Sequence, residues 1–440
     1  MRYAIPFLLV LAGLPAPGIA AQDVPTTTLG EALVEFPEPF TQLMGVRELS
    51  DGRVVVADPR ERALRVLDFG AGSSRQVGRE GAGPGEWRLP MAVFGLPGDS
   101  TVVFDVGNMR YLVLTPEPAP AYDFSLVVAG QPGAAGGGPG GGAVGRPMPS
   151  GQQGRPPGAP QGAARGQVAA ARTQAAAAGG GMLRGADGID RRGMLYSTSS
   201  PLRIGPDGPE VADSVAVLRM SRDGTRTDTI ASIHRPGAQA SGSTTSGGTQ
   251  VRLVIGAGTP FDPRDEWAVA PDGRVAVVRH SPYRVEWVAP AGTVTRGPVQ
   301  PYTPIRITNA DREAAAEARA RAGGLRVMAG PGGTQVTMGA GAMPEASDVA
   351  WPETKPPFTA GAARVAPNGH LWVLRTRAAS DQVPRYDVFD GAGRLVHRVA
   401  LPRETRLLGF GESTVYVVRR DADDLEYVQR LSSAGLFGGR

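Results

Sequence analysis

Short apolar runs alternate with turn residues along this chain, and two of the resulting units share one layout. The first unit runs from Asp51 to Asp68 and the second from Gly98 to Thr115. In each, a turn precedes a β-branched run, a polar loop and a second apolar run, a pattern that predicts a hairpin of buried strands. Aligning Asp58 with Asp105 gives a period of 47 residues, which is typical of propeller blades with four strands each.

A glycine-rich stretch, Gly78–Pro90, joins the two units. Its core, Gly83-Pro-Gly-Glu-Trp87, predicts a tight reversal, because glycine tolerates positive φ and proline fixes φ. The stretch superficially resembles a phosphate-binding loop. It lacks the Lys-Ser/Thr pair and leads into a strand instead of a helix, so we interpret it as a blade-joining turn.

The same pattern continues after residue 183 and predicts four further blades. The third blade is the least regular, and the later ones carry turn signals such as Asp272-Gly273 and Asn368-Gly369. An early strand, Ala32–Phe36, is expected to complete the last blade and close the ring. One helix is predicted over residues 308–322, with Thr308 and Asp311 as a capping pair and Gly323 as its stop.

These motifs resemble the NHL-type six-bladed β-propellers, and in particular a bacterial family of secreted six-bladed propellers. The resemblance is carried by the Gly83–Trp87 motif, by the strand-ending Asp58 and Asp105, and by Asn108 and Arg110. It covers about residues 40–125 and 350–432. It implies an all-β fold, a six-bladed β-propeller with disordered and helical insertions between blades, and because the matched motifs are architectural it implies no catalytic residue.

The expected organisation follows from these patterns. A signal peptide spans residues 1–21, and the closing strand with blades 1–2 spans 22–128. A disordered Gly/Pro/Ala-rich insert spans 129–182. Blades 3–6 span 183–440 and carry a flexible insert at 236–250 and a helical or loop insert at 306–350. Each insert falls between the outermost strand of one blade and the innermost strand of the next. We therefore expect all three on one face of the propeller, together with the loops between second and third strands.

The N-terminus predicts export. Met1-Arg2 precedes an apolar run from Tyr3 to Pro15 and a small-residue end at Gly18–Ala21, which is the pattern of a signal peptide cleaved after Ala20 or Ala21. No segment is long enough to predict a transmembrane helix. The chain has no Cys, hence no lipoprotein acylation site, disulfide or thiolate metal site, and a secreted or periplasmic location is expected.

The positive charge of the chain does not indicate nucleic-acid binding. The formal net charge is +4, and residues 128–183 carry four arginines and no acidic residue. The rest of the chain is therefore balanced, and the excess of positive charge lies in the insert and not on the predicted blades.

Seven residues after the turn of each blade, one position recurs at the end of a strand on the insert-bearing face. Its occupants are Asp58, Asp105, Ser199, Arg279, Arg375 and Arg419. On a functional interpretation this ring binds an acidic or zwitterionic ligand, because Arg pairs bidentately with carboxylate or phosphate. The neighbours that would form the rim are Arg60, Asn108, Arg110, His280, Arg284 and Arg420. On a structural interpretation the aspartates accept backbone N–H groups and the arginines are solvated or pair with Asp421 and Asp423.

Evidence for catalysis in the sequence is sparse. The chain has four histidines and neither a metal-binding His pair nor a Gly-x-Ser-x-Gly motif. Asp421–Asp424 lacks the ligand spacing of a helix–loop–helix calcium loop and is interpreted as a solvated acidic turn. Some six-bladed relatives are metal-dependent lactonases or lyases, so the resemblance keeps that alternative open.

We therefore expect a non-catalytic extracytoplasmic module that binds an acidic ligand, a peptide or a partner protein at the insert-bearing face, without a cofactor and without nucleic acid. The alternative is a lactonase-like, metal-dependent hydrolase or lyase with its site in the propeller channel, in which case Ca²⁺ or another divalent ion is expected. Neither the ligand nor the oligomeric state follows from the sequence.

Overall fold

The computed structural model describes residues 24–125, 186–199, 201–205, 208–236, 238–245, 248–255, 260–322, 324–330, 333–339, 351–434 and 436. The predicted signal peptide, residues 1–21, and the predicted disordered insert, residues 129–182, lie outside these residues.

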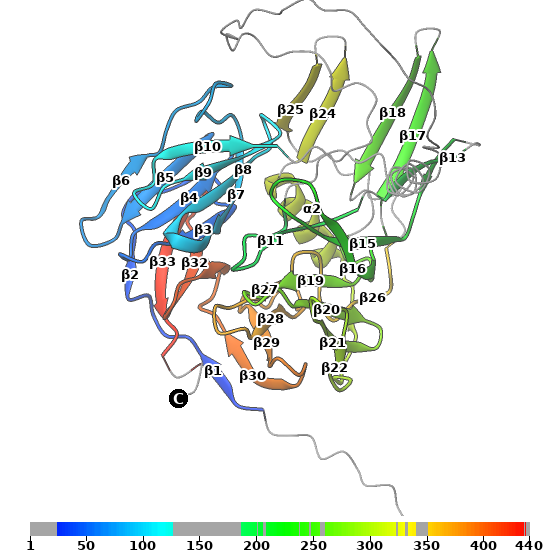
Figure 1. Cartoon of the computed structure of the whole chain (residues 1–440). Coiled ribbons are helices and arrows are strands. Elements are labelled where there is room, and N and C mark those ends of the chain that lie inside the picture. The colour runs from blue at the N-terminus through cyan, green and yellow to red at the C-terminus, as the bar shows by residue number, and fades with distance from the viewer. Residues whose placement is uncertain are drawn as a thin grey trace, which may run out of the picture.

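The described chain forms a six-bladed β-propeller (Figure 1), as the sequence pattern predicted. Each blade is a sheet of antiparallel strands in which neighbours along the chain pair with each other. Blade A consists of β3 (Gly45–Glu48), β4 (Val54–Asp58), β5 (Ala63–Asp68) and β6 (Ser73–Gln76). Blade B consists of β7 (Pro90–Gly95), β8 (Thr101–Asp105), β9 (Arg110–Leu114) and β10 (Pro120–Phe124). Blade C consists of β11 (Gly188–Ile189), β12 (Leu195–Thr198), β15 (Ser214–Met220) and β16 (Thr227–His234).

The last three blades, D to F, complete the ring. Blade D consists of β19 (Glu266–Val269), β20 (Val275–His280), β21 (Tyr283–Val288) and β22 (Val294–Arg296). Blade E consists of β27 (Ala363–Val365), β28 (Leu371–Leu374), β29 (Arg385–Phe389) and β30 (Leu395–Ala400). Blade F contains β31 (Thr405–Phe410), β32 (Thr414–Arg420) and β33 (Glu426–Ser432). The first strand of each blade is its innermost strand, and these strands contact one another around the axis.

The hydrophobic core is divided into six clusters, one between each pair of adjacent blades. Trp372 of blade E, for example, packs with Leu407 and Val417 of blade F. Second and third strands are buried on both faces, which explains why they appear in the sequence as continuous apolar runs instead of alternating ones.

The N-terminal segment binds to two blades. β2 (Val34–Glu35) pairs antiparallel with β33 and is the outermost strand of blade F, the position expected for the early strand. β1 (Thr26–Thr28) pairs parallel with β30 as a fifth strand of blade E, which the sequence did not predict. The strand edges of blades E and F are thus both covered by the same segment.

The glycine-rich turn between blades A and B is held by side chains from its own sequence motif. The buried Trp87 indole donates to the Val77 carbonyl over 2.8 Å, and Glu86 accepts the Gly83 N–H over 2.7 Å. Gly85 has a φ of +72° and a Cβ there would lie 3.1 Å from Pro120, so both backbone angle and space require glycine. The structure thus agrees with a blade-joining turn.

The crossovers between blades contain more regular structure than expected. The stretch 236–250, predicted to be flexible, overlaps a hairpin of β17 (Ala238–Thr245) and β18 (Gly248–Ile255). The 306–350 insert, predicted to be helical or loop, also contains the hairpin of β24 (Gly324–Gly330) and β25 (Gly333–Gly339). Short pairs are also formed by β13 (Leu202–Gly205) with β14 (Gly208–Val211), and by β23 (Ile305–Arg306) with β26 (Thr354–Lys355). Alternating small, Thr and β-branched residues in these stretches permit hairpins.

The predicted helix is α2 (Asn309–Ala322), and it lies among the loops that join second and third strands (Figure 1). At its start Asp311 accepts the Thr308 N–H and hydroxyl and, from blade E, the Ala379 N–H. At its end the Arg321 carbonyl accepts from Arg60 of blade A. α2 therefore extends from the loops of blade E to those of blade A, on the predicted face. No helix in the described part of the chain has the length and apolar character to cross a membrane.

Candidate active site

The predicted ring positions all lie where expected, at the ends of second strands on the face that carries α2. Asp58, Asp105, Arg279 and Arg419 belong to β4, β8, β20 and β32, and Ser199 and Arg375 directly follow β12 and β28. They are separated by the width of the blades, and each is bound to partners of its own neighbourhood.

The two aspartates organise backbone. Asp58 is 1% exposed and accepts N–H groups from Thr41, Gln42, Arg60 and Glu61. Asp105 is fully buried and accepts from Arg88 and Leu89 and from the Asn108 amide. Burial raises the pKa of Asp58 although the backbone N–H groups oppose this effect. Each carboxylate thus joins the segment before the first strand of its blade to the loop after the second strand of the same blade.

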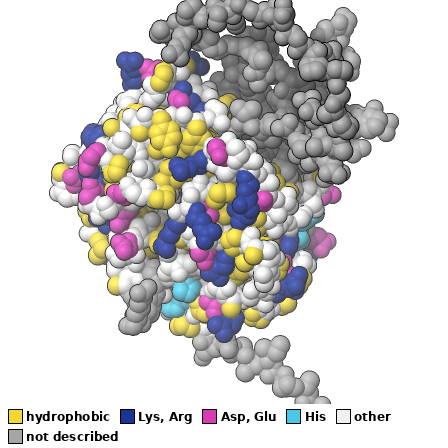
Figure 2. Space-filling view, in the orientation of Figure 1, with side chains coloured by type: hydrophobic (Ala, Val, Ile, Leu, Met, Phe, Trp, Pro, Cys, Tyr) yellow, Lys and Arg dark blue, Asp and Glu magenta, His cyan; other side chains and the backbone are white. Residues whose placement is uncertain are grey.

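The three ring arginines are neutralised by carboxylates. Arg279 contacts Asp265 and Glu286, at 2.7 and 2.9 Å. Arg419 pairs with Glu35 of the closing strand at 2.8 Å, and Arg375 lies 3.8 Å from the buried Asp387. The face visible in Figure 2 likewise shows basic side chains near its middle with acidic ones among them.

The remaining predicted rim residues do not converge. Asn108 and Arg110 donate to carbonyls of the glycine-rich turn, and Arg60 donates to the end of α2. Arg284 pairs with Glu286, and Arg420 with the buried Glu426. Among the predicted rim residues, His280 is the one whose imidazole contacts a buried carboxylate, an arrangement that can support acid–base chemistry.

That contact joins His280 to Asp265, the residue before β19. Asp265 Oδ1 lies 2.9 Å from His280 Nδ1 and also accepts the His280 N–H, while Oδ2 accepts the His234 N–H. Because an ionised carboxylate only accepts, the neutral imidazole carries its proton on Nδ1 and has its lone pair on Nε2. Nε2 forms no hydrogen bond within the described part of the chain.

The environment keeps Asp265 ionised. Its side chain is 5% exposed, and burial opposes ionisation, but the donors His234, His280 and Arg279 outweigh burial and lower the pKa of Asp265. The His234 ring stacks on that of His280 with centroids 5.5 Å apart. His280 is thus oriented by a fixed anion and a second ring, while 21% of its side chain remains accessible to a substrate.

Glu266, the next residue, is the second unusual group. It is 6% exposed, and its Oε1 has no hydrogen-bond partner. Burial raises its pKa, and the charges of Arg235, Arg264 and Arg364 act against this. Glu266 pairs with Val278 across the sheet, so it faces the boundary between blades D and E, where Val278 packs.

A divalent ion does not fit these residues. No group of three or more His, Asp or Glu side chains in the described ranges is arranged to hold a metal. The oxygens of Asp265 and Glu286 are occupied by arginine and backbone donors. In the acidic turn, Asp421 accepts its own loop's N–H groups from Asp423 and Leu425.

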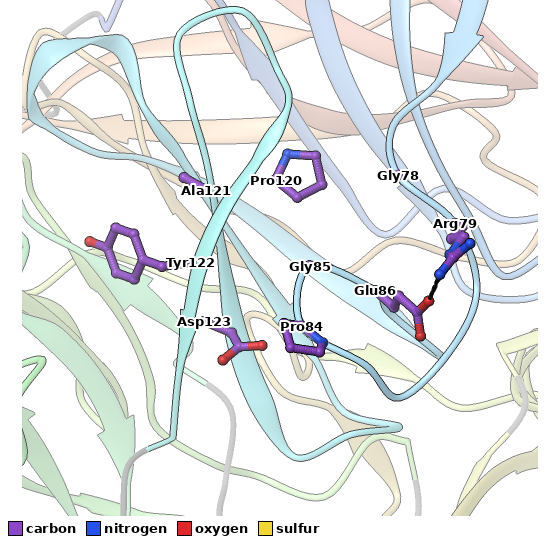
Figure 3. A pocket seen from close by; sticks show the side chains of 9 residues that line it. All are labelled: Gly78, Arg79, Pro84, Gly85, Glu86, Pro120, Ala121, Tyr122 and Asp123. Atoms are coloured by element: carbon purple, nitrogen blue, oxygen red, sulfur yellow. Dashed lines mark hydrogen bonds and ion pairs between the residues drawn. The ribbon is translucent and has the colours of Figure 1, made fainter. Parts of the chain in front are cut away.

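A cavity of about 540 Å³ lies elsewhere, between the glycine-rich turn and the outermost strand of blade B. Its charged lining is paired, Arg79 with Glu86 as Figure 3 shows, and Asp123 with Arg110. Tyr122 borders it and is 52% exposed. The cavity therefore presents aromatic and proline surface without a group suited to acid–base chemistry.

The sequence reasoning missed the carboxylates that pair with the ring arginines. Glu286 and Asp387 lie within the apolar runs of β21 and β29, and a lone charge in a buried strand is a signal that could have found them. Asp265 and Glu266 had no such signal, because they lie just before and at the start of β19, where a polar residue is ordinary.

No family model matches the chain, and no curated protein matches it. Solved structures with a similar fold include a gluconolactonase of Xanthomonas campestris (11% identity, 93% of this chain and 95% of that one, TM-score 0.37). They also include a luciferin-regenerating enzyme (11%, 92% and 96%, 0.37) and a PQQ-bound aldose sugar dehydrogenase of Streptomyces coelicolor (10%, 91% and 97%, 0.37). At these identities the likeness concerns the fold.

The expectation of a non-catalytic binding module is corrected at this point. The solved structures named above are enzymes, whereas the expected module was non-catalytic. Which reaction this chain supports has to be argued from its own residues.

Proposed function

We propose that this protein is a hydrolase that cleaves a small ester or lactone by general-base catalysis at His280. The observation that supports it is the 2.9 Å contact between Asp265 and His280 Nδ1, with Nε2 not bonded to any described residue. A carboxylate that orients an imidazole in this way fixes its tautomer and stabilises the imidazolium that forms during proton transfer.

In the proposed reaction, His280 Nε2 takes a proton from a water molecule as the water oxygen bonds to the acyl carbon. The acyl C–O bond then breaks, and the imidazolium returns the proton to the leaving alkoxide. Asp265 remains ionised throughout and is a positioning residue. No step passes through a metal, because the described side chains do not fit one.

The test is hydrolysis of a panel of p-nitrophenyl esters and lactones by the full chain, by His280→Asn and by a matched control, His397→Asn. His397 lies in β30 and bonds to Thr27 of β1, away from the proposed site. General-base catalysis contributes about 10²–10⁴-fold, so we expect His280→Asn to lose at least about a hundredfold and His397→Asn to retain activity. Absence of hydrolysis across the panel, or equal rates in both variants, would refute the proposal.

We further propose that the protein is exported after cleavage near Ala20 or Ala21 and that it acts outside the cytoplasm without a divalent ion. The basic and apolar N-terminal pattern supports export. N-terminal sequencing of the protein recovered from a secreting host tests the first point. Activity that survives chelation tests the second.

A further inference from the structure

Arg279 is held by acceptors from two blades, directly before the proposed catalytic histidine in the sequence. Its Nε donates to Glu286 Oε2 over 2.9 Å, and its Nη1 donates to Asp265 Oδ2 over 2.7 Å and to the Ser232 carbonyl over 3.0 Å. Glu286 lies on the neighbouring strand β21, diagonally across from Arg279 on the same face of blade D. The guanidinium is therefore fixed by two carboxylates of blade D and by a carbonyl of blade C.

The two oxygens of the Asp265 carboxylate have separate donors. Oδ2 accepts from Arg279 and, over 3.1 Å, from the His234 N–H. Oδ1 accepts the His280 N–H over 3.2 Å and lies 2.9 Å from His280 Nδ1. With Oδ2 bonded to Arg279, it is Oδ1 that faces the imidazole of His280.

The charge of Arg279 also affects the protonation of this carboxylate. The Asp265 side chain is 5% exposed, and burial opposes its ionisation, but hydrogen bonds from His234, His280 and Arg279 lower the pKa of Asp265. Of these three donors, Arg279 is the one that is always charged. An ionised Asp265 accepts from Nδ1–H, whereas a protonated one donates to Nδ1 and leaves the ring proton on Nε2.

We infer that Arg279 is a positioning residue, which acts through Asp265 to fix the tautomer in which His280 Nε2 carries the lone pair. Without Arg279, the buried Oδ2 keeps a single donor, and Asp265 either turns or takes up a proton from solvent. In both cases Nδ1 loses its ionised acceptor, and the tautomer with the proton on Nε2 gains population. That tautomer has no lone pair on Nε2 to accept a proton from water. The part of this role in catalysis rests on the proposed function, whereas the tautomer does not.

The experiment is nitrogen-15 NMR of the histidine side chains in the full chain, at a pH of about 8, where an ordinary imidazole is neutral. Protonated and unprotonated ring nitrogens differ in chemical shift, and the chain has four histidines. The His280 signals are those that disappear in His280→Asn. In Arg279→Met, the two His280 ring nitrogens should shift towards the tautomer with the proton on Nε2. Arg279→Gln keeps a polar side chain at this position, in case Met impairs folding, and should show the same change.

The matched control is Arg274→Met. Arg274 directly precedes β20 and pairs with Asp272 over 2.7 Å, and its side chain is 31% exposed, against 28% for Arg279. It lies at the opposite end of β20 from His280, so His280 should keep its wild-type tautomer in this variant. Arg279→Lys restores a cation next to Asp265 and should restore much of the Nδ1–H form.

Rates of ester hydrolysis are the second readout. Arg279→Met should lower kcat at least about tenfold with KM nearly unchanged, because Arg279 acts on the imidazole and not on the substrate. An unchanged His280 tautomer in Arg279→Met and Arg279→Gln, or an equal change in Arg274→Met, would overturn the inference whatever the rates. A changed tautomer in a protein whose wild type hydrolyses no ester would support the inference and refute the proposed reaction.

Discussion

The only lysine of the chain, Lys355, is buried and anchors α2, and replacing it by methionine should release the helix. Its Nζ lies 2.7 Å from Asp311 Oδ1, with the two side chains 3% and 1% exposed. Nζ also donates to the Arg377 carbonyl and lies 5.0 Å from the Phe261 ring centre. Lys355→Met keeps most of the volume and leaves Asp311 as a buried charge without its cation.

Removing one partner of a buried ion pair costs about 3–5 kcal/mol. The low end applies here, because Asp311 keeps the Thr308 and Ala379 donors. Apart from Asp311, the helical residues 309–321 are exposed or only partly buried, so a loss of about 3 kcal/mol should appear as local release of α2 and not as unfolding of the blades.

Amide hydrogen exchange measures this directly. A loss of about 3 kcal/mol corresponds to about a hundredfold faster exchange of amides in α2, while amides of the fully buried β4 should keep their rates. The matched control is Glu317→Gln, which breaks the exposed pair with Arg321 and should change exchange little, by less than about 0.5 kcal/mol. If α2 exchanged at the wild-type rate in Lys355→Met, the anchoring role would be wrong.

Three further outcomes follow from buried polar and apolar contacts. Burial opposes ionisation of Asp311, but hydrogen bonds and Lys355 outweigh it and depress the pKa of Asp311 to about 2. The stability that this ionisation contributes, about 2 kcal/mol, is present above pH ~4 and is lost as the pH falls towards 2. Hydrogen exchange of α2 should therefore accelerate between pH ~4 and pH ~2. Trp372→Ala empties a fully buried site between blades E and F and should cost about 3–5 kcal/mol in urea unfolding, against little for a substitution of the exposed Leu33. Asp105→Ala leaves the Arg88 and Leu89 N–H groups without their acceptor and should cost about 3 kcal/mol by the same assay, with a wild-type midpoint counting against the role assigned to Asp105.

The fold was accessible from the sequence because its signals are local. Strand-ending Asp58 and Asp105, the Gly83–Trp87 turn and the Thr308–Asp311 cap each act on backbone within a few residues or on the next blade. Repetition of one unit then determines the architecture, since a blade buries its faces only against other blades.

The site was not accessible in the same way, because the partners of each charge come from distant segments. Arg419 was expected to be free for a ligand or paired with nearby acids, but its partner is Glu35, brought close by the closing strand. Arg279 meets Asp265 and Glu286 through the pairing of β20 with two other strands. Which arginines remain without an acidic partner, and so could bind a ligand, depends on this arrangement and not on spacing along the chain.

The measurement that tests the central claim most directly is chemical rescue of His280→Gly in ester hydrolysis. If His280 Nε2 is the general base, the variant should lose at least about a hundredfold in rate, and added imidazole should restore part of it in a saturable manner. Asp265→Asn should impair the wild-type imidazole without being rescued, because Asp265 only positions it. A His280→Gly variant that hydrolyses at the wild-type rate, or that imidazole does not accelerate, would contradict the account.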